Sequence, residues 1–188
     1  NPEYAVPRAH AKGVKVIGLV GNVRNARRLA DVGADVIVAQ GYESGGHTGR
    51  VGTLALIPQV VDAVKPLPVV AAGGVGDGRG LVAALALGAC GVWVGTVFLL
   101  AHESCIDPPK DWVLNVGMDP YGLEQWEIDN WKDKIIAATE EDTRVTRIYT
   151  GKTARVINNK LIEAWEKGGG RTLPMPLQSL LISEVALG

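Results

Sequence analysis

The sequence contains few cysteines, little net charge and no long hydrophobic run. Its 188 residues include only two cysteines, Cys90 and Cys105, so a disulfide framework is not indicated. The formal net charge is −1 and charged residues make up 21% of the chain, so we expect neither nucleic acid nor an anionic membrane surface as a partner. Glycines interrupt the longest hydrophobic stretches, and no membrane span or signal peptide stands out. These absences favour a cytoplasmic enzyme that folds as one domain.

Glycine, by contrast, is abundant. The chain has 24 glycines, and with valine and alanine they are concentrated in its first half. There, short apolar runs alternate with helical patterns about every thirty residues, which is typical of a parallel sheet with right-handed crossover helices. We predict strands at residues 14–20, 34–39, 68–72 and 91–98, and helices at residues 4–12, 24–32, 53–64 and 79–87.

The composition changes after Ala101. Residues 105–133 contain three prolines and three of the five tryptophans without a clean periodicity, so we interpret them as an insertion or lid with short helices. Beyond this segment the patterns predict a helix, a strand, a second helix and a glycine- and proline-rich tail. These lie at residues 134–141, 144–149, 153–167 and 168–188.

Five predicted strands are too few for a closed (β/α)8 barrel, which needs eight strands and about 250 residues. Because the strands end in glycine turns, we favour the α/β class and the second half of a TIM barrel over an open sheet. Residues 1–104 would form barrel strands 4 to 7, and residues 134–188 the last strand, a helix and the tail. The first three strand–helix units would precede Asn1 or lie on another polypeptide, in a partner chain or a homodimer. A half-barrel alone would expose one face of its core.

Two glycine turns follow neighbouring predicted strands and are the first candidates for a ligand site. The apolar run 69–72 is followed by Gly73 and Gly74, and the next strand ends in Gly95 and Thr96. Residues without a Cβ let a ligand approach backbone N–H groups, and late strands of TIM barrels carry phosphate sites. A single Gly-Gly turn is more often simple turn chemistry, but two on adjacent strands favour an anion site.

A third candidate is the glycine-rich loop that begins at Gln40. The Gln40 amide stands at a strand end, where it can both donate to and accept from a heteroaromatic ring. Gly45 and Gly46 give backbone access, and His47 follows them at the expected barrel mouth, where an imidazole can take up a proton near neutral pH. A lone histidine is more commonly structural or solvated. Here it shares one end of the strands with both glycine turns, which favours a catalytic role.

Other polar residues give weaker signals. Glu43 and Ser44 either support the ligand-binding groups or are simply solvated, and Asp77 is expected to begin a helix. His10 is expected at the surface, and Cys90 in the apolar interior. We assign no metal ligands.

These motifs resemble the nitronate monooxygenases, once called 2-nitropropane dioxygenases. The similarity runs from about Gly13 to Ser104 and continues more loosely from Asp142 to Arg155. The resemblance implies an FMN-binding TIM barrel that oxidises alkyl nitronates or nitroalkanes with O2 and without a nicotinamide cofactor. The residues that carry it are Gly33-Ala34-Asp35, Ala39-Gln40-Gly41, Gly45-Gly46-His47, Pro68 to Gly74, Gly78-Arg79-Gly80, Leu87-Gly88-Ala89 and Gly95-Thr96.

The resemblance also implies a role for each candidate residue. By position, Gln40 and Gly45 would contact the flavin, and His47 would be the base that removes the proton α to a nitro group. That proton is acidic enough for an imidazole to remove. The residues that would hold the FMN phosphate through backbone N–H groups are Gly73, Gly74, Trp93, Val94, Gly95 and Thr96.

The sequence departs from the family pattern at two positions. Val97 stands where members usually have arginine, and Leu19 stands where some have lysine. Both changes remove a positive charge near the expected flavin and weaken anion binding there. The family's first half, with further flavin contacts, lies outside this sequence.

Two other functions stay open. The loop Glu43-Ser-Gly-Gly-His47 and residues 58–64 also resemble the FMN-dependent enoyl-ACP reductases, which reduce a fatty acyl chain with NADH. The absent strands and Val97 are also compatible with a non-catalytic flavin-binding or structural subunit. NADH should bleach the bound flavin only in the reductase, and a protein without flavin absorbance would be a structural subunit.

Overall fold

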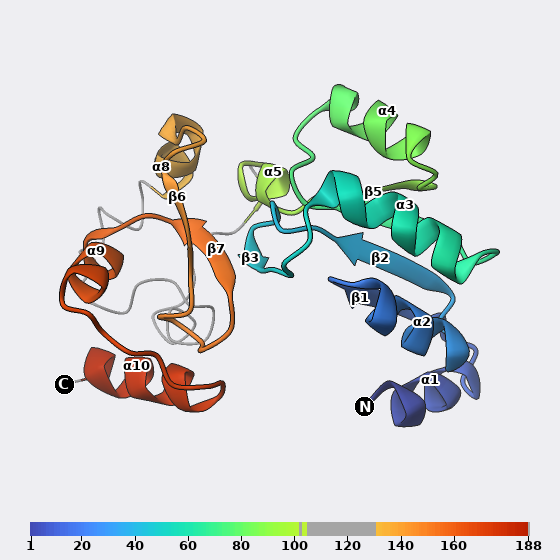
Figure 1. Ribbon diagram of the computed structural model, residues 1–188, viewed down its shortest axis with the longest axis horizontal. Coiled ribbons are helices and arrows are strands. Elements are labelled where there is room, and N and C mark those ends of the chain that lie inside the picture. Colours follow the sequence, from blue (N-terminus) through green and yellow to red (C-terminus); the bar gives the residue numbers. More distant parts are fainter. Residues whose placement is uncertain (102, 105–130, 188) are drawn as a thin grey trace. The chain divides into compact units, whose positions relative to one another are not determined.

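The computed structural model describes residues 1–101, 103–104 and 131–187 (Figure 1). The chain forms two compact units, Asn1–Gly95 and Thr96–Gly188. Most of the insertion expected at 105–133 lies outside the described residues, so that expectation stays a prediction. Within the described part of the chain, no helix is both long enough and apolar enough to cross a membrane.

The first unit alternates helices and strands. Its elements are α1 (Pro2–His10), β1 (Ile17–Val20), α2 (Val23–Asp31), β2 (Val36–Gln40), β3 (Gly46–His47), α3 (Thr53–Val64), β4 (Val69–Ala72), α4 (Gly78–Ala86) and β5 (Gly91–Trp93). Four strands form a parallel sheet in the order β1-β2-β4-β5, which follows the chain (Figure 1). The predicted α/β class and parallel sheet are confirmed, and closure into a barrel stays a prediction.

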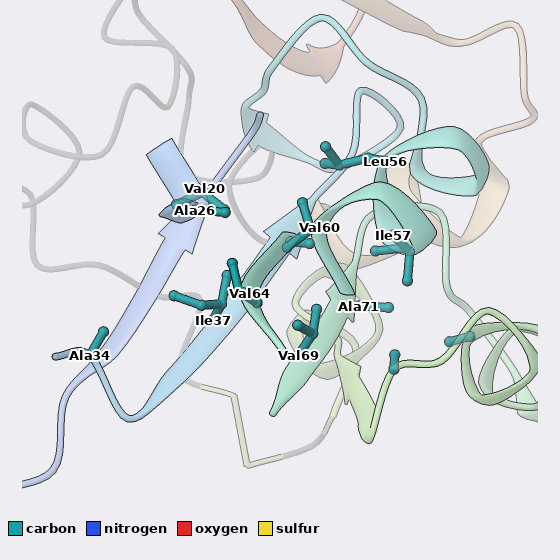
Figure 2. Close-up of a cluster of buried hydrophobic side chains, with 13 residues drawn as sticks. Val20, Ala26, Ala34, Ile37, Leu56, Ile57, Val60, Val64, Val69 and Ala71 are labelled. Carbon is teal, nitrogen blue, oxygen red and sulfur yellow. The ribbon is translucent and has the colours of Figure 1, made fainter. Parts of the chain in front are cut away.

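One face of this sheet packs against helices. Alternate strand residues point to that face, and Figure 2 shows Ile37 and Val69 beside Val60 and Val64 of α3 in one buried hydrophobic cluster. Ile37 and Val60 have 0% of their surface exposed. Burying a side chain of this size stabilises the fold by about 1.5–3 kcal/mol. The cluster therefore fixes the sheet against its helices.

The opposite face of the sheet is open at both edge strands. Ile17 and Leu19 of β1 are each 53% exposed, and Trp93 of β5 is 51% exposed. Leu19 alternates with Val20, which belongs to the helix-facing cluster, so the two side chains point to opposite faces. Between the edge strands this face is covered, since Val38 of β2 and Ala72 of β4 are 1% and 4% exposed. The exposed core face expected for a half-barrel is therefore seen at the edge strands, and the half-barrel itself stays a prediction.

Capping side chains begin two helices of this unit where the sequence places them. Asn22 Oδ1 accepts a hydrogen bond from Asn25 N at 2.9 Å and starts α2. Asp77 Oδ1 accepts one from Arg79 N at 2.9 Å and starts α4, as expected. Each cap satisfies a helical N–H group that has no partner within the helix.

The second unit contains a separate core. Its elements are α5 (Thr96–Leu99), α8 (Trp131–Ala137), β6 (Thr143–Thr146), β7 (Ala154–Ile157), α9 (Lys160–Lys167) and α10 (Leu177–Leu187). Ile148, Tyr149, Ile162 and Ile182 form its buried cluster. Gln178 is fully buried there, and its amide donates to Ile148 O at 2.6 Å, which satisfies the polar group.

Two expectations for the second unit are wrong. The helix expected at 153–167 begins only at Lys160, because Ala154–Ile157 forms β7 and the Asn159 side chain caps α9. The strand expected at 144–149 forms as β6, but it pairs antiparallel with β7 and is no parallel barrel strand. The turn between them contains Gly151 at φ +78°, a conformation that reverses the chain tightly.

Two details of β5 also differ from the expectation. The predicted strand at 91–98 ends at Trp93, and Thr96 begins the short helix α5. Cys90, expected in the interior, is exposed. It lies just before an edge strand of the sheet, where no further strand pairs with β5 among the described residues.

Candidate functional site

The carboxyl ends of three strands lie side by side at one end of the first unit's sheet, which we call its carboxyl edge. Gln40, the last residue of β2, is in register with Ala72 at the end of β4, and Ala72 is in register with Trp93 at the end of β5. The three predicted ligand segments therefore start side by side. Gly95 lies two residues beyond Trp93, whereas Thr96 opens the second unit.

The turn after β4 requires glycine. Gly73 and Gly74 have φ values of +102° and +71°, a region that L side chains rarely adopt. A Cβ on Gly73 would lie 3.0 Å from Thr53 Oγ1 and 3.1 Å from Ser44 N. The turn therefore lies directly against the loop that follows β2, and both glycines are needed for this approach.

The loop between β2 and α3 is closed at its base by backbone hydrogen bonds. Gly41 N donates to Ala72 O at 2.9 Å, which extends the β2–β4 ladder by one residue, and Tyr42 N donates to Val51 O at 2.8 Å. Gly45, Gly46 and His47 lie farther along this loop and are exposed. The candidate base thus projects from a loop whose two ends are held together at the carboxyl edge.

A carboxylate anchors this loop to the next helix. Glu43 Oε2 accepts a hydrogen bond from Thr53 N at 2.8 Å and lies 2.7 Å from Thr53 Oγ1. Thr53 Oγ1 also lies 3.0 Å from Gly73 O. The sequence left the role of Glu43 undecided and did not identify Thr53 at all. The available signal was Gly52 at the start of α3, a cap that has no side chain of its own.

Ser44 is the one buried polar residue of the loop. Only 6% of its surface is exposed, and its N–H donates to Gly41 O at 3.2 Å. Its Oγ has no hydrogen-bond partner among the described residues. A buried hydroxyl without a partner costs stability, and it commonly marks a place where a water or ligand atom belongs.

The other histidine of the first unit lies near the amino ends of the strands, which form the amino edge of the sheet. His10 Nε2 lies 2.8 Å from Asp35 Oδ2, and Asp35 directly precedes β2. Lys15 Nζ and Val16 N donate to the same carboxylate, each at 2.8 Å. These hydrogen bonds, led by that of Lys15, hold the pKa of Asp35 well below its usual range. His10 serves an ion-pair cluster and is remote from the carboxyl edge.

Comparison with known proteins identifies relatives of this chain. The family model described as nitronate monooxygenase matches residues 1–116. A Bacillus subtilis protein named "Probable nitronate monooxygenase" is 40% identical over 189 residues, covering 96% of this chain and 48% of that protein.

Two solved structures resemble this chain as well. FabK from Thermotoga maritima has a TM-score of 0.72 at 35% identity, covering 95% of this chain and 50% of FabK. Nitroalkane oxidase from Streptomyces ansochromogenes has a TM-score of 0.69 at 28% identity, covering 98% of this chain and 50% of the oxidase. The chain spans about half the length of the proteins it matches. Because the family model matches more than half of it, the chain belongs to the nitronate monooxygenase family, whose members are flavin oxidoreductases.

Proposed function

We propose that this chain carries the FMN site of an enzyme that oxidises alkyl nitronates or nitroalkanes with O2. The observation that carries the proposal is the common edge at which Gln40, Ala72 and Trp93 end three adjacent strands in register. The segments that follow these residues are those that the family resemblance assigns to flavin. Membership of a family of flavin oxidoreductases supports the same assignment.

The residues at this edge fit a phosphate-bearing group. Gly73 and Gly74 adopt left-handed conformations that can present backbone N–H groups to an anion. Ser44 adds a buried hydroxyl whose Oγ has no partner among the described residues. These donors suit a site in which backbone amides, rather than an arginine at position 97, would bind the phosphate. The residues proposed to hold it are Gly73, Gly74, Trp93, Val94, Gly95 and Thr96.

His47 is the proposed catalytic base. The neutral imidazole accepts the proton from the carbon next to the nitro group, and the electron pair of that C–H bond passes onto the nitro oxygens of the nitronate. Its exposed position on a glycine-rich loop supports access to a small substrate. Gln40 and Gly45 would bind the flavin ring, and bound FMN would supply the electron-accepting chemistry.

The second candidate is an FMN-dependent enoyl-ACP reductase that uses NADH. It rests on the Glu43–His47 loop, which resembles those reductases and which adjoins the glycine turn after β4. In that reaction NADH supplies the hydride, so the two candidates differ in their requirement for a nicotinamide. The third candidate is a flavin-binding or structural subunit without catalytic activity.

We infer that a second half-barrel completes the site. The exposed face marked by Ile17, Leu19 and Trp93 is apolar, and the chain spans about half the length of its relatives. Further strands that pair with β1 and β5 would close a (β/α)8 barrel, enclose this face and remove the open sheet edges. These strands would come from the same protein, a partner chain or a second copy. A cytoplasmic location stays a prediction.

The test uses the purified full-length protein that contains this chain. Its absorbance spectrum should show oxidised flavin, and extraction should release FMN. Under anaerobic conditions an alkyl nitronate should bleach that flavin, whereas NADH should leave it oxidised. Bleaching by NADH but not by nitronate would favour the reductase, and a spectrum without flavin bands in a folded protein would favour the structural subunit.

A further inference from the structure

We propose that Glu43 and Thr53 form a positioning pair that holds the His47 loop against the glycine turn after β4. The inference rests on the proposed function, since it assigns the pair to the same site. Neither residue is a candidate for contact with substrate. Their role would be to fix the spacing between the segment that carries the base and the segment that binds phosphate.

The contacts form a continuous path between the two segments. Glu43 Oε2 accepts from Thr53 N at 2.8 Å and lies 2.7 Å from Thr53 Oγ1, which in turn lies 3.0 Å from Gly73 O. The hydroxyl has one proton, so it donates to the carboxylate or to the carbonyl at any one time. A shift of either partner therefore changes the bond to the other, and the hydroxyl couples the two segments.

Three glycines make room for this pair. A Cβ on Gly41 would overlap Thr53, and a Cβ on Gly52 would lie 3.0 Å from Glu43 Oε1. A Cβ on Gly74 would lie 3.1 Å from Glu43 Cβ. Contacts closer than about 3.4 Å are uncommon for a real side chain, so larger residues at these positions would displace the pair. The loop, the helix and the turn are thus each built around the same two side chains.

The helix terminus explains why a carboxylate occupies this place. Gly52, the N-cap of α3, makes no side-chain hydrogen bond, so the first N–H groups of the helix need an acceptor from elsewhere. Glu43 provides it from ten residues upstream, where the positive end of the helix dipole also favours a negative charge. An ordinary cap at position 52 would satisfy α3 equally well but would leave the His47 loop unattached to it.

The test measures amide hydrogen exchange in the full-length protein, with and without added FMN. Thr53→Val removes the hydroxyl but keeps the N–H and the branched shape, and Thr53→Ser restores the hydroxyl. We expect Thr53→Val to speed exchange about tenfold in both segments, because a charge-assisted hydrogen bond contributes about 1.4 kcal/mol or more. The reporters are the Ser44 N–H of the loop, which donates to Gly41 O, and the Gly41 N–H, which donates to Ala72 O directly before the turn. Thr53→Ser should return both segments to wild-type rates.

Glu43→Gln tests the charge, and Asp62→Asn is its matched control. Asp62 lies near the other end of α3, where its carboxylate pairs with Lys65 Nζ at 2.7 Å on the surface. Glu43→Gln should speed exchange in both segments and weaken FMN binding about tenfold, while Asp62→Asn should change neither. The double variant of Glu43→Gln with Thr53→Val should be no worse than the stronger single variant, since both break one path.

Three results would overturn the proposal. Faster exchange confined to the first turn of α3 would show a simple helix cap, and faster exchange in only one of the two segments would show that they are not coupled. Equal effects of Asp62→Asn would show a general loss of stability. If the wild-type protein binds no flavin, the proposed function fails, yet exchange in the flavin-free protein still decides whether the pair couples the two segments.

Discussion

The two ends of the strands in the first unit, the amino edge and the carboxyl edge of the sheet, are built differently. At the amino edge, the Asp35 carboxylate accepts from Lys15 and Val16 and contacts His10, so each of its oxygens is engaged. At the carboxyl edge, the chain turns on glycines and leaves the buried Ser44 Oγ without a partner among the described residues. The Asp35 carboxylate is thus fully engaged where the strands begin, whereas at their ends Glu43 and Thr53 bond to each other and the buried Ser44 hydroxyl stays available. Parallel α/β folds commonly divide stability and function in this way.

Removal of the proposed base at the carboxyl edge should cause the largest loss of turnover. His47→Asn should slow turnover of neutral nitroalkanes by about 10²–10⁴-fold while flavin content stays unchanged, because only proton removal is lost. Steady-state kinetics on nitroalkanes and flavin absorbance together measure both effects. His10→Asn, at the amino edge, is the matched control and should leave turnover intact. Equal turnover by the His47→Asn variant and the wild-type enzyme would refute the assignment.

Filling the glycine turn should affect flavin binding and the stability of the turn. Gly74→Val places a β-branched side chain at φ +71°, against Glu43, so it should prevent FMN from copurifying and destabilise the turn by about 1–3 kcal/mol. Gly76→Val is the control, since a Cβ there would meet no atom within 4 Å. Flavin content and thermal unfolding measure the two outcomes. A Gly74→Val protein that retains its full complement of FMN would show that phosphate binds elsewhere.

Ser44→Ala should have opposite effects on stability and on binding. Removing a buried hydroxyl that lacks a partner should stabilise the flavin-free protein by about 1 kcal/mol. If the hydroxyl donates to the bound group, the same change should weaken FMN binding by about tenfold or less. Thermal unfolding and flavin titration separate the two. Lower stability of the flavin-free variant would mean that the hydroxyl already has a partner in the protein.

The smallest effect belongs to the amino edge. Lys15 and its neighbours lower the folded-state pKa of Asp35, so its stabilising contribution is complete above the unfolded-state pKa of about 3.9 and is lost as pH falls through the folded value. Asp35→Asn should therefore lower the Tm at pH 7, and the difference from wild type should shrink below about pH 4. A difference that stays constant down to pH 2 would show that the charge of Asp35 contributes nothing.

Local patterns in the sequence were sufficient for much of the first unit. The apolar run before Gly73 predicts β4 and its turn, and Asp77 predicts the start of α4. Parallel strands end at a common edge, so the neighbouring positions of Gln40 and Gly73 also follow from the sequence. Whether His47 and Thr96 join them around one ligand stays a prediction.

The features that the sequence did not predict depend on residues far apart. The Glu43–Thr53 link spans ten residues and is recognisable only once the loop has folded back onto α3. In the second unit, residues 154–157 fit a helical pattern, but pairing with β6 determines their conformation. Propensity alone does not reveal such a pairing because the partner strand decides it.

A crystal structure of the full-length protein with FMN bound would test the proposed site most directly. We expect the phosphate to lie against the backbone N–H groups of Gly73, Gly74 and residues 93–96, with the flavin ring beside Gln40 and Gly45 and within reach of His47. Density for FMN at another edge of the sheet, or a phosphate that makes no contact with the Gly73–Gly74 turn, would contradict it.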